Sequence, residues 1–127
     1  MQIENAISGL ILDAAIEVHR TLGGPGLLES IYEDALAFEL IARGRTIDRQ
    51  RAVPVVYQGH ALVNPLRLGL LVDGKVIVEC KALIDYNPIF EAQTLTYLRI
   101  TGLRLGIVIN FGTQRIKDGF HRVVNNL

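Results

Sequence analysis

Two opposite charges, Glu79 and Lys81, stand two residues apart in the otherwise apolar, strand-like segment of residues 75–82. Side chains alternate between the two faces of a strand, so both charged groups share one face with Ile77. One interpretation is an ion pair on the solvated face of an edge strand. The other is a functional site, because burying a carboxylate and an ammonium between apolar flanks is costly unless they have partners or a role.

Two more pairs of polar residues have helical spacing. Glu29 and Tyr32 lie three apart near the start of a predicted helix, directly after the glycine-rich turn of residues 22–26. Glu29 is open to two interpretations: a carboxylate that favours the positive end of the helix dipole, or a group that the turn aims into a site. Gln93 and Tyr97 lie four apart and share a face of a later predicted helix.

Hydrophobic periodicity predicts the elements that must position these side chains. Helices are expected over residues 3–21, 28–43 and 89–102, the second with Ile31, Ala35, Phe38 and Ala42 on one face. Strands are expected over 53–57 after the polar group 48–51, then over 61–64, 66–72, 75–82, 103–111 and 116–124, with Asp73-Gly74 as a hairpin turn. The sequence therefore predicts one α+β domain over residues 1–127, with a central sheet flanked by helices.

Composition limits the classes of function. Thirteen basic and thirteen acidic residues cancel, so the chain lacks the global positive field of a non-specific nucleic-acid binder. The basic cluster Arg43, Arg45, Arg49 and Arg51 is expected to be a solvated surface. One cysteine excludes an intrachain disulfide and a cysteine-ligated zinc site.

Location and assembly also follow from composition. No segment reaches the roughly 20 consecutive apolar residues of a membrane span, and the N-terminus lacks a signal-peptide pattern, so we expect a cytoplasmic protein without a membrane partner. Half of the residues are hydrophobic, which raises the hypothesis of a homo-oligomer.

Several segments, in this order, resemble a known family. Residues 26–32 fit the pattern Gly-x-x-Glu-x-x-Tyr, and the chain resembles the small bacterial GxxExxY proteins of the PD-(D/E)XK nuclease-like superfamily from its first helix to Gly112. The other matching segments are residues 76–82, 91–93 with Tyr97-Leu98, 101–106 and 110–112.

This resemblance implies a three-layer αβββαβ core, here with an extra N-terminal helix, and magnesium-dependent cleavage of nucleic acid. A hard cation such as Mg2+ prefers oxygen ligands and neutralises charge at the phosphorus. By resemblance, Glu79, the Cys80 carbonyl and Glu29 would bind the metal, and Lys81 would direct the attacking water. Gln93 and Tyr97 would support the site or touch the nucleic-acid backbone.

At one position the chain departs from the family. Family members usually carry Arg-x-Asp-Leu-Leu-Val in the partner strand, whereas residues 67–72 place Gly69 at the aspartate position. Asp73 is a poor substitute, because four residues of strand separate it by about 13 Å. We therefore expect impaired magnesium binding and cleavage, and the competing hypothesis is a non-catalytic module that binds nucleic acid or a protein partner.

Overall fold

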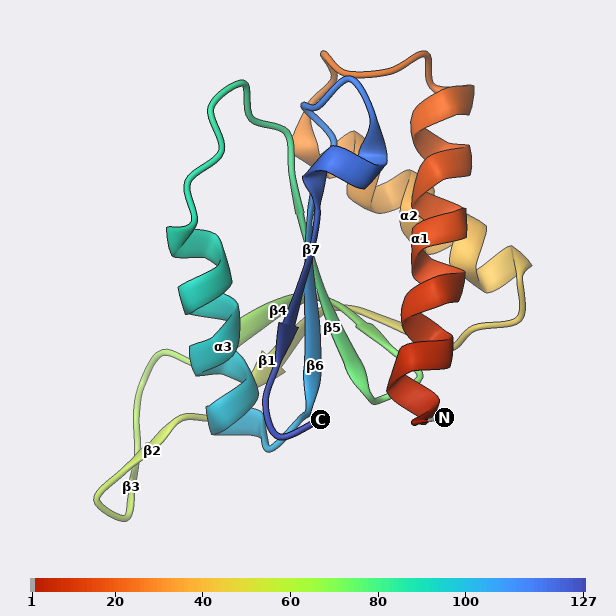
Figure 1. The fold of residues 1–127 in the computed structure, drawn as a ribbon. Helices are drawn as coiled ribbons and strands as arrows, with labels where there is room; N and C mark the ends of the chain where they lie inside the picture. The colour runs from red at the N-terminus through yellow and green to blue at the C-terminus, as the bar shows by residue number, and fades with distance from the viewer. Residues whose placement is uncertain (1) are drawn as a thin grey trace.

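The computed structural model describes residues 2–127 and arranges them in three layers (Figure 1). A five-stranded sheet forms the middle layer. Helices α1 (Ile3–Thr21) and α2 (Glu29–Ala42) cover one face of the sheet, and α3 (Ile89–Thr101) covers the other. The predicted α+β class with an extra N-terminal helix is confirmed.

The sheet has the order β1-β4-β5-β6-β7. Its strands are β1 (Ile47–Val53), β4 (Leu66–Val72), β5 (Val76–Lys81), β6 (Leu105–Asn110) and β7 (Phe120–Val124). Neighbouring strands are antiparallel except β5 and β6, which are parallel because α3 provides the crossover between them. Asp73 and Gly74 form the predicted turn between β4 and β5, with φ values of 55° and 67° that suit a tight hairpin.

Strand β5 contributes side chains to both faces of the sheet. Val76, Val78 and Cys80 are buried against α1 and α2, in a core that includes Ile11 and Leu36. Ile77 is buried on the other face with Leu68 and Leu98, beneath α3. Because side chains alternate along a strand, Glu79 and Lys81 project from the α3 face.

Several strand boundaries expected from the sequence are wrong, including the strand expected over 61–64, which in the structure ends at Ala61. The polar group 48–51 lies inside β1, because this edge strand exposes most of its side chains and is held by backbone pairing with β4. Residues 53–57 do not form one strand: β1 ends at Val53, and after Pro54 the short strands β2 (Val56–Tyr57) and β3 (His60–Ala61) form a separate hairpin. The last strand is also shorter, because residues 116–119 form the 3-10 helix η1 (Ile116–Gly119).

The apolar stripe of α2 seen in the sequence is not the face that α2 buries. Phe38 is 74% exposed and Ile31 is 41% exposed, whereas Tyr32, Leu36 and Leu40 are fully buried. The Tyr32 ring stacks on the Phe111 ring at a centroid distance of 4.7 Å, which turns residues 32, 36 and 40 inward. An apolar row therefore remains on the outer surface of α2.

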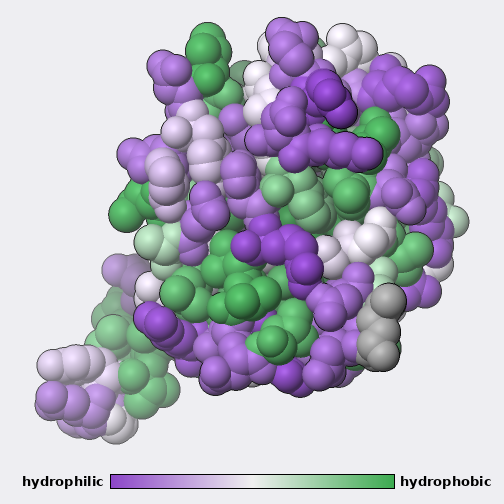
Figure 2. Space-filling view, viewed as in Figure 1, coloured by the Kyte–Doolittle hydropathy of each residue, from purple (hydrophilic) through white to green (hydrophobic). Residues whose placement is uncertain are grey.

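The β2–β3 hairpin projects from the body of the molecule, at lower left in Figure 2. Its hydrophobic side chains are exposed, including Val56 and Tyr57. Among residues 2–127, no helix has the length and hydropathy needed to cross a membrane.

Candidate functional site

The sheet opens at Gly69, next to Glu79. The β4–β5 ladder pairs Leu70 with Val78 and does not continue to Gly69 and Glu79. The β1–β4 ladder is also interrupted at Gly69, where the facing residue, Gln50, has a φ of 50°. The Gly69 N–H instead donates a hydrogen bond to Glu79 Oε2 at 2.8 Å.

Gly69 carries no side chain beside the Glu79 carboxylate. A Cβ atom at Gly69 would lie 3.4 Å from each carboxylate oxygen of Glu79 and 3.0 Å from the Val78 carbonyl oxygen. The φ of Gly69 lies outside the left-handed region, so its backbone does not itself require glycine. The Glu79 carboxylate therefore lies directly beside Gly69, a residue that supplies no carboxylate of its own.

Burial is the main influence on the charge of Glu79. It raises the pKa of the Glu79 carboxyl to about 7, although the Gly69 N–H and the charge of Lys81 both oppose the rise. The carboxylates of Glu33 and Glu29 raise this pKa further. A proton therefore competes with any cation for Glu79 near neutral pH.

Two of the predicted site residues accompany Glu79 on the α3 face. The Lys81 Nζ lies 4.4 Å from the ring centroid of Phe90, in the first turn of α3, so the ammonium is held over an aromatic face. Burial and the nearby charge of Glu79 both raise the pKa of Tyr97, which places its hydroxyl group in the electrostatic neighbourhood of the carboxylate. Gln93 is exposed one turn before Tyr97.

The α2 helix supplies two carboxylates, of which the sequence indicated only one. Glu29 is exposed at the start of α2, whereas Glu33, one turn later, is 9% exposed. Glu33 also acts more strongly than Glu29 on the pKa of Glu79. Its carboxylate accepts hydrogen bonds from the Gln50 amide at 3.2 and 3.3 Å and lies 3.5 Å from an Arg49 nitrogen. The spacing of four residues from Glu29 was the signal that could have identified Glu33.

Tyr32, the tyrosine of the Gly-x-x-Glu-x-x-Tyr pattern, fixes the turn before α2. Its hydroxyl donates to the Gly24 carbonyl at 2.7 Å and accepts the Leu27 N–H at 3.1 Å. These bonds close the glycine-rich turn, where Gly24 and Gly26 have φ values of 103° and 115°. Tyr32 therefore determines where α2 begins and where Glu29 lies.

The Cys80 carbonyl, a predicted metal ligand, is directed toward the opened edge of β5. The Val78 carbonyl points toward β4, and alternate carbonyls on a strand point the same way. By contrast, the Cys80 side chain is buried on the α1 and α2 face, and burial raises the pKa of its thiol.

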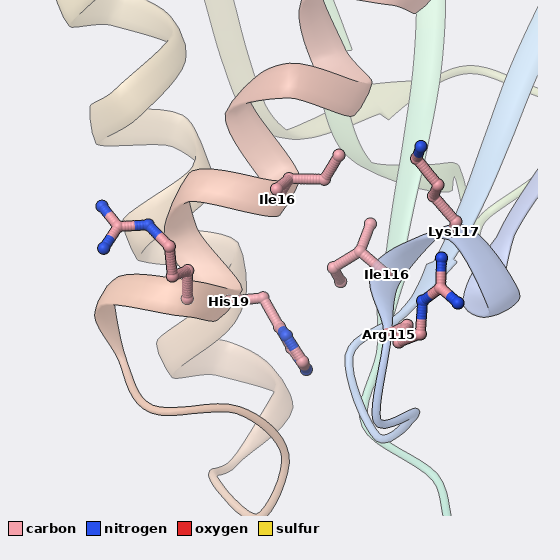
Figure 3. A pocket seen from close by; sticks show the side chains of 6 residues that line it. Ile16, His19, Arg115, Ile116 and Lys117 are labelled. Carbon is pink, nitrogen blue, oxygen red and sulfur yellow. The ribbon is translucent and has the colours of Figure 1, made fainter.

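A hollow on the opposite face of the sheet is not part of this site (Figure 3). It is lined by Ile16, His19, Arg20, Arg115, Ile116 and Lys117. His19 Nε2 is hydrogen-bonded with the Thr113 carbonyl at 3.0 Å, and the Arg20 guanidinium is bound to Glu17. The basic groups of this hollow do not converge on one point (Figure 3).

The residues around Glu79 do not fit a divalent metal ion. Within residues 2–127, no group of three or more His, Cys, Asp and Glu side chains is placed to hold a metal. Glu79 supplies one carboxylate, which is partly protonated near neutral pH and already accepts the Gly69 N–H. Gly69 supplies no ligand, and Glu29 is exposed on a helix that covers the other face of the sheet.

Comparison with known proteins identifies the family. Neither the curated proteins nor the solved structures give a significant match to the chain. The model of the PD-(D/E)XK nuclease superfamily matches residues 5–123, from α1 to β7, and so includes Gly69, Glu79 and Lys81. Nucleases of this superfamily typically use divalent metal ions. The chain belongs to the PD-(D/E)XK nuclease superfamily.

Proposed function

We propose that the chain is a GxxExxY-type nuclease-fold protein in which magnesium-dependent hydrolysis of nucleic acid is impaired. One observation carries the proposal: the Glu79 carboxylate lies on the bare Cα of Gly69 and accepts its N–H at 2.8 Å. An aspartate at this position would place a second carboxylate beside Glu79. Without it, the site lacks the paired oxygen ligands that hold a hard cation.

The remaining polar side chains still suit contact with a nucleic-acid backbone. Lys81 offers an ammonium that can pair with a phosphate oxygen, and Tyr97 and Gln93 offer hydrogen-bond donors on the same side of the sheet. The proposed partner of this face is therefore nucleic acid, bound without efficient cleavage.

A second candidate function is a non-catalytic module that binds a protein partner. The basic cluster of Arg43, Arg45, Arg49 and Arg51 favours this function, because each of these arginines already forms an ion pair with an acidic side chain within 4 Å. Arg43 pairs with Glu39, Arg45 with Asp73, Arg49 with Glu33 and Asp34, and Arg51 with Asp48. This surface therefore offers little unpaired positive charge to a phosphate backbone.

Calorimetric titration with Mg2+ and Mn2+ tests the proposed defect. The native chain is expected to give little binding heat, whereas Gly69→Asp should bind the metal and Gly69→Asn should not, because asparagine has nearly the same shape without the charge. Glu79→Gln in the Gly69→Asp background should abolish the gain. Equal affinity of the native chain and Gly69→Asp would refute the proposal.

Cleavage assays give an independent readout. Single-stranded, duplex and flap DNA are incubated with each variant and metal. Metal-dependent cleavage by the native chain that is lost in Glu79→Ala would show an active nuclease and overturn the proposed impairment. Binding of the same DNA by the native chain, weakened by Lys81→Ala, would support the nucleic-acid partner over the protein partner.

A further inference from the structure

Three aromatic side chains adjoin one another on the α3 face of the sheet, beside the candidate site. The Tyr86 ring stacks on the His121 ring at a centroid distance of 4.4 Å and an angle of 12°. The Phe90 ring lies on the other side of this group, 6.0 Å from the Tyr86 ring and tilted by 50°. The Lys81 Nζ lies 4.4 Å from the Phe90 centroid. Phe90, Tyr86 and His121 therefore form an aromatic strip that begins at Lys81.

The aromatic strip is assembled from segments that are distant in the chain. Tyr86 belongs to the loop between β5 and α3, at upper left in Figure 1, and Phe90 to the first turn of α3. His121 belongs to β7, an edge strand of the sheet. The register pairs His121 with Val108 and Val108 with Glu79. The strip therefore runs from the strand that carries the candidate site to the edge of the sheet.

Glu91 holds two of the rings in place. The Tyr86 hydroxyl donates a hydrogen bond to Glu91 Oε2 at 3.2 Å, and the same oxygen lies 3.9 Å from His121 Nδ1. Burial and the charge of Glu91 raise the pKa of Tyr86 above its ordinary value, so the hydroxyl keeps its proton and remains a donor. Rings that are oriented before a ligand arrives lower the entropic cost of binding it.

Protein covers the aromatic strip only in part. Phe90, Tyr86 and His121 are each half-buried, and the His121 side chain is 28% exposed. Because a stacked pair covers one face of each ring, the area that remains exposed is available to another flat ring system. Nucleobases are ring systems of this kind, and their stacking on aromatic side chains tolerates any sequence.

The charged groups that contact the strip match one orientation of a nucleotide. Among residues 2–127, the Lys81 ammonium takes part in no ion pair, so it can meet a phosphate at the Phe90 end of the strip. The Glu91 carboxylate, beside Tyr86 and His121, would repel a phosphate but can accept a hydrogen bond from a base amino group. The phosphate end and the base end of the strip are therefore distinct.

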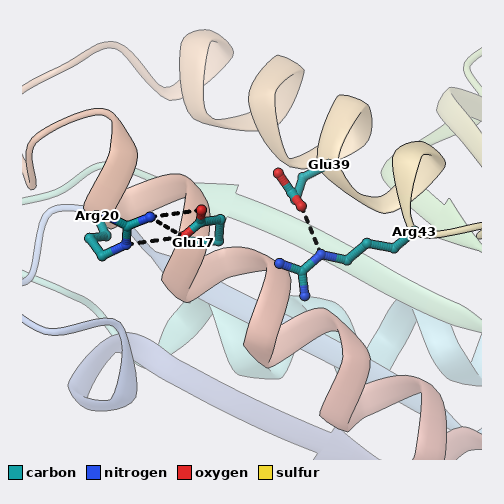
Figure 4. A network of polar contacts seen from close by, with 4 residues as sticks. All are labelled: Glu17, Arg20, Glu39 and Arg43. Atoms are coloured by element: carbon teal, nitrogen blue, oxygen red, sulfur yellow. Dashed lines mark hydrogen bonds and ion pairs between the residues drawn. The ribbon is translucent and has the colours of Figure 1, made fainter.

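The helices on the opposite face offer little free positive charge. Arg20 binds Glu17 and Arg43 binds Glu39, each at 2.7 Å (Figure 4). The formal net charge of the chain is also zero. Binding through phosphate contacts alone would therefore be weak, and stacking has to supply much of the affinity. Stacking favours a strand with unpaired bases over a duplex, in which the base faces are already covered.

We propose that the aromatic strip binds an unpaired base of single-stranded nucleic acid, with the adjoining phosphate at Lys81. The base stacks on the Tyr86–His121 pair. This inference rests on the nucleic-acid partner proposed above and adds the class of strand that the face accepts.

Fluorescence titration with a single-stranded DNA oligonucleotide that carries one 2-aminopurine tests the stacking, because stacking quenches this base. The chain contains no tryptophan that would interfere with the signal. The native chain should quench the fluorescence and prefer the single strand to a duplex of the same sequence. Tyr86→Leu should lower the affinity about tenfold and reduce the quenching, whereas Tyr86→Phe, which keeps the ring, should retain both.

Further variants separate stacking from other effects. His121→Leu, in a different element, should weaken binding in the same way as Tyr86→Leu, which guards against an effect of one substitution on folding. Tyr57→Leu is the matched control, because Tyr57 is 61% exposed on the β2–β3 hairpin, away from the strip. Lys81→Ala should reduce the slope of log affinity against log salt by about 0.7, the contribution of one single-strand phosphate, and Tyr86→Leu should leave the slope unchanged.

The outcomes distinguish this inference from the proposed function. Equal affinity of the native chain for single strand and duplex, or unchanged binding and quenching in both Tyr86→Leu and His121→Leu, would overturn the aromatic strip and leave the nucleic-acid partner intact. Loss of binding in Tyr86→Phe would assign the contact to the hydroxyl and would also overturn stacking. A native chain that binds neither strand form would overturn the nucleic-acid partner as well.

Discussion

Replacement of Glu79 by glutamine should remove a pH dependence from the stability of the fold. The carboxyl of Glu79 has a pKa of about 7 in the folded chain, against an ordinary value of 4.5, because burial disfavours its charged form. The folded state therefore holds this proton more tightly than the unfolded state. The resulting stability is present below pH 4.5 and is lost as the pH rises toward 7.

The pKa difference sets the size of the effect. Each unit corresponds to about 1.4 kcal/mol, so the free energy of unfolding should fall by about 3 kcal/mol between pH 4.5 and pH values above 7. In Glu79→Gln this fall should be absent, because the amide does not ionise. The amide oxygen can still accept the hydrogen bond from the Gly69 N–H, so the folded geometry is retained.

Urea unfolding of both proteins at a series of pH values, with a chelator present to remove trace metals, measures the effect. The difference between the two stability curves isolates Glu79 from every other titrating group. A parallel NMR titration of the Glu79 carboxyl carbon should give a midpoint near 7. Identical pH profiles for native and variant chains, or a midpoint near 4.5, would refute the burial of an ionisable Glu79 beside Gly69.

Three further substitutions test the structure around the site by urea unfolding at one pH. Tyr32→Phe should lower the free energy of unfolding by about 1–2 kcal/mol, because the Gly24 carbonyl and the Leu27 N–H lose their hydrogen bonds to the hydroxyl while the ring stack remains. An unchanged free energy of unfolding would refute the role of this hydroxyl in closing the turn. Asn110→Ala should lower the free energy of unfolding by about 3 kcal/mol, because the buried amide accepts hydrogen bonds from the Leu83 and Gly112 N–H groups and donates one to the Leu83 carbonyl. A loss below about 1 kcal/mol would contradict this prediction. Gly112→Ala should lower the free energy of unfolding by about 2 kcal/mol, because a Cβ atom would overlap the Leu83 backbone. An unchanged urea midpoint of unfolding would show that the loop around Gly112 moves freely to make room.

Local rules allowed much of the fold to be predicted from the sequence. The helix over residues 3–21, the Asp73-Gly74 turn and the C-terminal stop of α3 at Gly102 depend on side chains close in sequence, and all three agree with the structure. The edge strand β1 was missed, because it is held by backbone pairing with β4 and its polar side chains carry no strand-like period. The buried face of α2 was also missed, since the Tyr32–Phe111 stack joins residues 79 positions apart and no local pattern reports it.

The candidate site was also predicted only in part from the sequence. Sequence spacing placed Glu79 and Lys81 on one face of a strand and Gln93 and Tyr97 on one face of a helix. The resemblance to the family, and not the spacing, implied that Gly69 is a departure. Only the tertiary structure revealed the buried Glu33, the opening of the sheet at Gly69 and the hydrogen bond that occupies Glu79. The physical reason is that the pKa and the partners of a carboxylate depend on burial and on charges brought together from α2, β4 and β5, which are distant in the chain.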